Sequence, residues 1–106
     1  MNIEILRDYV LQKEGVMESF PFGESVLVFK VKNKIFLLLP LDETPLQFNV
    51  KCDPAKAIEW REQYPLNVLP GYHMNKKHWN TIITGSNLKQ SQLKEMIDDS
   101  YSLVKK

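Results

Sequence analysis

The sequence has little of what anchors or cross-links many small proteins. It contains a single cysteine, Cys52, so no internal disulfide can form, and we expect a reducing, cytoplasmic environment. The longest apolar run, residues 35–41, includes a proline and is far shorter than the roughly 18 residues that cross a bilayer. The first residues, MNIE, lack the basic and apolar regions of a signal peptide. We therefore expect no membrane association.

An excess of charge of one sign is also missing, since the formal net charge is +1. Hydrophobic residues make up 43% of the chain and charged residues 25%, which argues against disorder and predicts a buried core. A chain of 106 residues is long enough for one such core and too short for two. We expect residues 1–106 to form a single domain, and that domain to be a monomer.

Hydrophobic periodicity predicts both helices and strands. Helical spacing of apolar residues indicates helices at residues 2–14, 54–64 and 88–104. Strand patterns and turn residues indicate strands at residues 17–23, 26–32, 35–39, 46–52 and 78–84. The order α-β-β-β-β-α-β-α predicts an α+β fold in which an antiparallel sheet packs against helices.

Two connections carry specific expectations. The tripeptide at residues 32–34 (KNK) is a signal for a tight hairpin between two strands. Residues 65–77 contain two prolines, a glycine and two asparagines, and we expect a long ordered loop there. Loops of that length in compact domains are often functional, so this segment is a candidate site.

Motifs of enzymes are mostly missing. The chain has no glycine-rich phosphate loop and no nucleophile elbow, and we predict neither an enzyme nor a cofactor. Cys52 could serve as a nucleophile with His73 or His78 as its base, but it shares the apolar parity of its strand and is better explained as a buried residue. The two histidines lack neighbouring cysteine or acidic ligands, so we predict no metal site.

The basic residues are unevenly distributed. Residues 1–24 carry a net charge of −3, whereas residues 25–84 carry +3. Lys30, Lys32 and Lys34 share one parity and would form a basic stripe along one face of the hairpin. Lys76 and Lys77 lie among aromatic residues, a pattern that suits contacts to phosphates and bases. The alternative is that the lysines confer solubility and protect a sheet edge.

Several segments resemble one protein family. They are residues 18–23 (ESFPFG), 28–31 (VFKV), 51–54 (KCDP) and, above all, 70–81 (PGYHMNKKHWNT). Ser100 and Tyr101 match a C-terminal signature of the same family. On these residues the chain is similar to the MmcQ/YjbR family, and the resemblance runs over nearly the whole sequence.

The resemblance implies a CyaY-like (frataxin-like) fold and a proposed double-wing surface that binds DNA on the antiparallel sheet. Such an analogy between folds does not establish an activity. Iron binding of the frataxin type is not expected, because Glu4, Asp8 and Glu14 are too few for a ridge of oxygen ligands.

The segment at residues 70–81 allows two interpretations. In the structural one, Trp79 and Tyr72 fold the loop over the sheet, and Asn75, Asn80 and His78 tie its backbone groups. In the functional one, the loop presents Lys76, Lys77 and His73 to an anion.

We therefore expect a small non-enzymatic protein that binds DNA, mainly through phosphates. The expected contacts are six lysines: Lys30, Lys32, Lys34, Lys51, Lys76 and Lys77. The alternative is an adaptor that binds a protein or a small ligand in a cleft near the 72–79 loop. The candidates for that loop or pocket are Tyr72, His73, Asn75, His78 and Trp79, with Trp60 as a further wall of the cleft.

Overall fold

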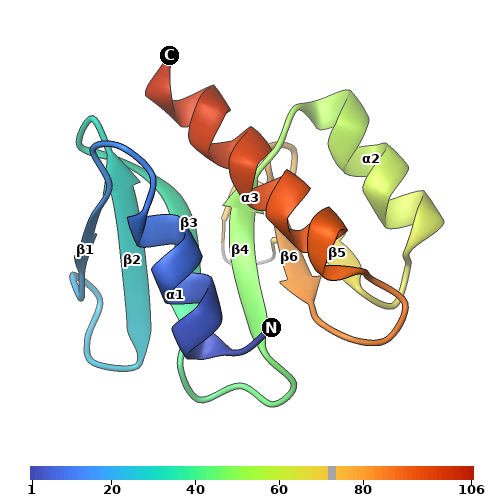
Figure 1. The fold of residues 1–106 in the computed structure, drawn as a ribbon. Helices are drawn as coiled ribbons and strands as arrows, with labels where there is room; N and C mark the ends of the chain where they lie inside the picture. The colour runs from blue at the N-terminus through green and yellow to red at the C-terminus, as the bar shows by residue number, and fades with distance from the viewer. Residues whose placement is uncertain (72–73) are drawn as a thin grey trace.

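The computed structural model describes residues 1–71 and 74–106 and contains three helices and six strands (Figure 1). The helices are α1 (Ile3–Leu11), α2 (Pro54–Gln63) and α3 (Gln90–Lys105). The strands are β1 (Met17–Ser19), β2 (Val26–Val31), β3 (Lys34–Pro40), β4 (Gln47–Lys51), β5 (Val68–Pro70) and β6 (Trp79–Ile83).

The six strands form one antiparallel sheet in the order β1-β2-β3-β4-β6-β5. A two-residue turn joins β2 to β3, and its residues Lys32 and Asn33 have φ angles of 50° and 64°. Positive φ at both positions gives the turn the twist that two-residue hairpins need. The predicted hairpin is therefore confirmed.

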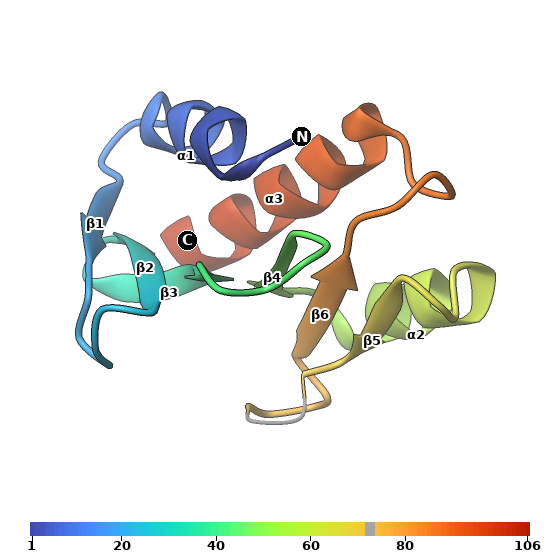
Figure 2. The same cartoon turned by 90° about the horizontal axis from the view of Figure 1, so that it is seen from below.

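The helices leave one face of the sheet open. Figure 2 shows α1 and α3 above the sheet, while α2 lies beside β5. The core lies between the sheet and the helices, and its largest fully buried side chains are Phe29, Phe36 and Phe48. The connection from β1 to β2 and the described part of the connection from β5 to β6 project on the other side (Figure 2). Loops frame that open face, and no helix of the described residues lies over it.

Both edges of the sheet are short. β1 and β5 each have three residues. Pro21 follows β1 after one further residue, and Pro70 is the last residue of β5. Proline has no backbone N–H, so each edge loses a donor close to the end of its strand.

Ser100 of α3 joins β3 to β4 where the two strands separate. The ladder between them pairs Leu37 with Val50 and Leu38 with Asn49. One step further, the fully buried Ser100 hydroxyl donates to the Phe36 carbonyl at 2.5 Å and accepts the Lys51 N–H at 2.9 Å. A side chain of the helix thus replaces a direct bond between the strands.

The neighbouring Tyr101 fastens the start of the chain to α3. Its hydroxyl donates to the Glu14 carbonyl at 2.5 Å, and its ring packs edge-on against Phe36 with 5.5 Å between centroids. Lys13 also reaches α3 and forms an ion pair with Asp98. The Ser100–Tyr101 signature therefore has a structural role in this fold.

The predicted α+β class and the order of the elements are confirmed, with one strand added. Residues 65–77 were expected to be a loop, and that expectation is wrong for β5, which pairs with β6 from Val68–Ile82 to Pro70–Asn80. A three-residue edge strand that ends in proline has no alternating pattern long enough to reveal it. The first helix is also shorter than the predicted 2–14, because the chain leaves it before the turn at Gly15.

Replacing Ser100 with alanine should destabilise the fold by about 1–3 kcal/mol, because a buried carbonyl and a partly buried N–H would lose their partner. The free energy of unfolding from urea titration measures the loss. Ser102→Ala is the matched control, since Ser102 lies on the same helix and is exposed. Equal stability of the two variants would contradict the role given to the Ser100 hydroxyl.

Candidate binding groove on the open face

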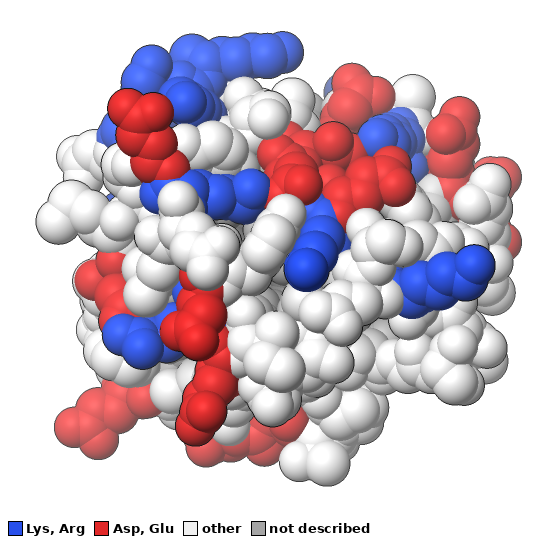
Figure 3. Space-filling view, in the orientation of Figure 1, with Lys and Arg blue, Asp and Glu red and all other residues white. Residues whose placement is uncertain are grey.

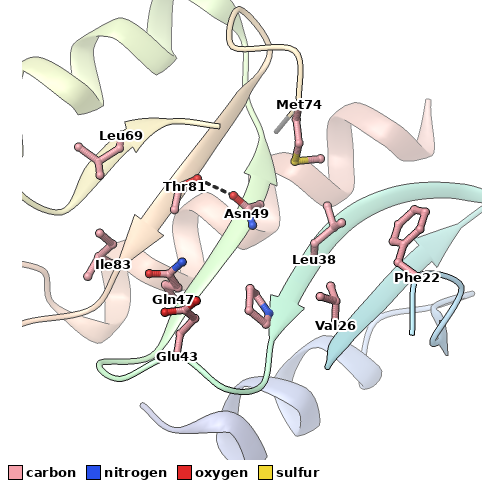
Figure 4. Close-up of a pocket in the computed structure, with 11 residues that line it drawn as sticks. Phe22, Val26, Leu38, Glu43, Gln47, Asn49, Leu69, Met74, Thr81 and Ile83 are labelled. Carbon is pink, nitrogen blue, oxygen red and sulfur yellow. Dashed lines mark hydrogen bonds between the residues drawn. The ribbon is translucent and has the colours of Figure 1, made fainter. Parts of the chain in front are cut away.

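A groove of about 680 Å³ crosses the open face of the sheet (Figure 4). Its lining comes from five strands and from the segments that border them: Phe22, Val26, Leu38, Pro40, Glu43, Gln47, Asn49, Leu69, Met74, Thr81 and Ile83. A hollow of this size is in the range of pockets that hold small molecules.

The alternation of the strands places these side chains together. In β4 the buried Phe48 faces the helices, so its neighbour Asn49 faces the groove. Asn49 pairs with Leu38 on one side and with Thr81 on the other, and Thr81 pairs with Leu69. Partners across a ladder share a face, which gives one row of groove residues from β3 to β5.

The row has apolar ends and a polar centre. The Thr81 hydroxyl donates to Asn49 Oδ1 at 2.5 Å, as Figure 4 shows. With its oxygen engaged in this way, the Asn49 amide nitrogen can donate to a ligand; no hydrogen bond from it occurs among residues 1–71 and 74–106. Leu38 and Leu69 flank this pair and supply apolar contact surface.

Among the described residues that line the groove, Glu43 is the one that carries a charge. It lies on the exposed connection between β3 and β4. Figure 4 shows its carboxylate beside the side chain of Gln47, at the opposite end of the groove from Met74. The groove is thus apolar along its walls, amide-lined in its centre and acidic at one end.

The rim near Met74 is held by hydrogen bonds of Asn75. The Asn75 carbonyl accepts from the backbone N–H groups of His78 and Trp79 at 3.1 and 2.9 Å, and its side chain accepts from the Lys77 N–H at 3.0 Å. These bonds close a compact turn just before β6. Met74 extends from this rim toward Leu38 (Figure 4).

Arg61 of α2 holds the same rim from behind the sheet. Its Nε donates to Asn80 Oδ1 at 2.7 Å, and its Nη2 donates to the carbonyls of Lys76 and Trp79. Sequence reasoning missed this residue, because Arg61 reads as one more charge on an amphipathic helix. Its counterpart, the buried Asn80, was the available signal, since a polar side chain on the core parity of a strand needs a partner.

The hairpin lysines do not all lie on one face, so the predicted stripe is wrong. The two-residue turn pairs Lys30 with Ile35 and Lys34 with Val31. Val31 belongs to the core, so Lys34 lies on the helix side of the sheet and Lys30 on the open side. Lys32 is exposed in the turn itself and borders a hollow beside β1 together with Lys30.

The other three basic candidates lie nearer to the groove. Lys51 follows Asn49 on the same face of β4, one step beyond the lining residues. Lys76 and Lys77 are exposed on the rim, on the side to which the connection from β5 to β6 projects (Figure 2). On the helix-covered side, acidic and basic side chains are interspersed (Figure 3).

The aromatic and histidine candidates are not found in the lining of the groove among the described residues. Tyr72 and His73 lie outside the described residues. Trp79 is half-buried and pairs with Lys51, but it does not line the groove. Trp60 is buried on the helix side against Tyr64, so the expectation that it walls the cleft is wrong. Its place on the apolar stripe of α2 turns it toward the core.

The expected structural role of the loop residues is confirmed for Asn75. His78 takes part through its backbone, since its carbonyl accepts from the Cys52 N–H at 2.7 Å. Asn80 acts through Arg61 rather than on the backbone of the loop.

Cys52 is 7% exposed, as its apolar parity predicts. Burial raises the pKa of its thiol to about 11, with the nearby Lys56 acting in the opposite direction. A thiol that stays protonated at neutral pH is a poor nucleophile. Among the residues that the structure describes, no group of three His, Cys, Asp or Glu side chains is placed to hold a metal, and no helix is long and apolar enough to span a membrane.

The fold and the groove define a small α+β protein with one open sheet face. The YjbR family model matches residues 11–103, so the chain belongs to the YjbR family. The resemblance seen in the 70–81 segment and in Ser100–Tyr101 is thereby confirmed.

Relatives of the chain are known by sequence and by structure. It is 42% identical over 102 residues to uncharacterised protein YbdF of Escherichia coli O157:H7, and the match covers 95% of this chain and 82% of the relative. It is 30% identical over 101 residues to uncharacterised protein YjbR of Escherichia coli strain K12, and this match covers 95% of this chain and 85% of the relative. The crystal structure of Deinococcus radiodurans protein DR2400 superposes with a TM-score of 0.94 at 35% identity (99% of this chain, 79% of that one). None of these names assigns an enzymatic activity.

The burial of Cys52 lowers the reactivity of its thiol at a given pH, because it raises the pKa. The Cys52 thiol should react with a disulfide reagent at pH 8 about 100-fold more slowly in the folded protein than in guanidinium chloride, as a pKa raised from 9.0 to about 11 implies. Cys52→Ser is the control for the reagent, and equal rates in the two states would contradict the burial.

The same shift makes stability depend on pH. The folded state favours the protonated thiol, so this contribution to the free energy of unfolding is complete below pH 9 and is lost as the pH rises toward 11.

Proposed function

We propose that this protein binds a small, mainly apolar molecule in the groove on the open face of its sheet. The observation that carries the proposal is the groove itself, a single hollow lined from five strands with hydrogen-bonding side chains at its centre. Binding sites for small molecules typically combine apolar walls with a few polar groups that orient the ligand.

The packing of the groove supports this proposal. Leu38, Leu69 and Ile83 are only half-buried although they lie inside a folded sheet. Covering such side chains gains about 25 cal/mol for each Å² removed from water, so an apolar ligand has a driving force to enter. Asn75 and Arg61 hold the rim at residues 74–78. Because the rim is already ordered, it loses less conformational entropy when a ligand binds.

The lining favours binding over catalysis. Among the described residues of the lining, Glu43 is the single ionisable side chain, and none of the others is a histidine, cysteine or lysine. General acid–base and nucleophilic chemistry require such partners within hydrogen-bond reach.

For the location of the protein we propose a reducing cytoplasm, which suits the buried free thiol of Cys52.

The neutral probe 2-naphthylmethanol should shift the backbone amide NMR signals of Leu38, Asn49 and Thr81. Leu38→Ser should weaken its binding about tenfold, because the apolar contact is lost. Leu66→Ser is the matched control, since Leu66 is 77% exposed and does not line the groove. Unchanged affinity of Leu38→Ser, or shifts confined to residues outside the groove, would contradict the proposal.

DNA binding is the second candidate, and the placement of four lysines favours it. Lys30 and Lys51 lie on the open face, and Lys76 and Lys77 lie on a rim that projects to the same side (Figure 2). The contacts would be to phosphates. Glu43 and the apolar lining between these lysines do not suit the duplex backbone, which is why this candidate comes second.

If DNA binds here, the double variant Lys76→Ala/Lys77→Ala should weaken binding of a labelled duplex and lower the slope of log affinity against log salt by up to about 2. Fluorescence anisotropy at several salt concentrations measures both quantities. The control is Lys34→Ala/Lys106→Ala, which removes the same charge while sparing the rim. An equal loss in both variants, or no binding of the parent protein at low salt, would exclude a DNA site on this face.

A further inference from the structure

The charge at one end of the groove indicates which ligands it favours. Glu43 lies on the connection between β3 and β4, and its carboxylate is beside the side chain of Gln47 (Figure 4). Within the described residues Glu43 takes part in no ion pair. Its carboxylate is therefore available to a group that the ligand brings.

On β4 the one lysine, Lys51, lies at the end of the strand away from Gln47 and Glu43. Gln47, Asn49 and Lys51 follow one another on this face. Strand residues advance by about 3.3 Å, so the backbone at Lys51 lies about 13 Å from that at Gln47. At this distance an exposed charge is largely screened at physiological salt.

The polar groups between these ends add directional contacts. Figure 4 shows the Gln47 amide beside the Glu43 carboxylate, and the Asn49 amide further in. The amide oxygen of Gln47 accepts hydrogen bonds, as the carboxylate does. Two acceptors at one end of an apolar groove suit a donor with several N–H groups, and an ammonium group has three.

We propose that the groove selects apolar ligands that carry a basic amine, with the amine at Glu43 and Gln47 and the apolar body over Leu38 and Ile83. This inference rests on the proposed function, because it names the class of ligand for the same groove. A carboxylate or phosphate at this end would face Glu43 and be repelled.

Three probes with one apolar body test the charge preference: 2-naphthylmethylamine, 2-naphthylmethanol and 2-naphthoate. NMR titration of the groove amides gives a dissociation constant for each. The amine should bind about two- to fivefold more tightly than the alcohol, the range expected for a solvent-accessible ion pair, and the carboxylate more weakly than the alcohol. Added salt should reduce the difference.

Glu43→Gln should remove the preference for the amine and leave the affinity for the alcohol unchanged. Asp42→Asn is the matched control, because it removes an equal charge from the adjacent exposed residue, whose side chain does not line the groove. It should keep the preference.

The outcomes separate this inference from the proposed function. If the alcohol binds in the groove but the amine has no advantage, or the carboxylate binds more tightly, the inference is wrong while the proposed function stands. The same holds if Glu43→Gln keeps the preference. If none of the probes shifts the groove amides, both are wrong.

Discussion

The fold depends on a hydroxyl group that joins the two halves of the sheet. Ser100 bonds to Phe36 and to Lys51, at the position where β3 and β4 no longer reach each other. A sheet whose strands diverge leaves buried backbone groups without partners, and each costs free energy unless another group satisfies it. Because α3 supplies that group, the strands can separate at this end while Leu38 and Asn49 remain paired beneath the groove. The helix thus supports the site from the opposite face.

The second constraint is the rim, which is held from two directions. Asn75 closes the turn within the loop, and Arg61 reaches through from α2 to Lys76 and Trp79. Gly71 completes the closure, since a Cβ at this position would lie 3.1 Å from that of Trp79. In the described part of the 70–81 motif, Gly71, Asn75 and Asn80 therefore have structural roles. A function that uses the rim at residues 74–78 relies on these contacts.

The sequence predicts the elements well where a periodic pattern is long, and the site less well. The alternation from Phe48 to Cys52 indicates which face of β4 is buried, and this assignment is correct. The groove could not be predicted in this way, because its lining is assembled across five strands and depends on the register. The error at Lys34 has the same origin. The two-residue turn sets which residues pair, so the alternation of faces along β2 does not continue into β3, and Lys34 pairs with Val31. Glu43 looked like an ordinary turn residue until the fold placed it beside Gln47.

The short, proline-terminated edges of the sheet also limit how this molecule can meet others. Strand addition and edge-to-edge aggregation both need a run of free N–H and C=O groups along an edge, and three residues with a proline at or near the end of the strand offer very few. Each edge therefore presents few free backbone groups, and among the described residues no helix covers the open face of the sheet. A macromolecular partner has to recognise side chains on a face, which makes recognition depend on the particular residues displayed there.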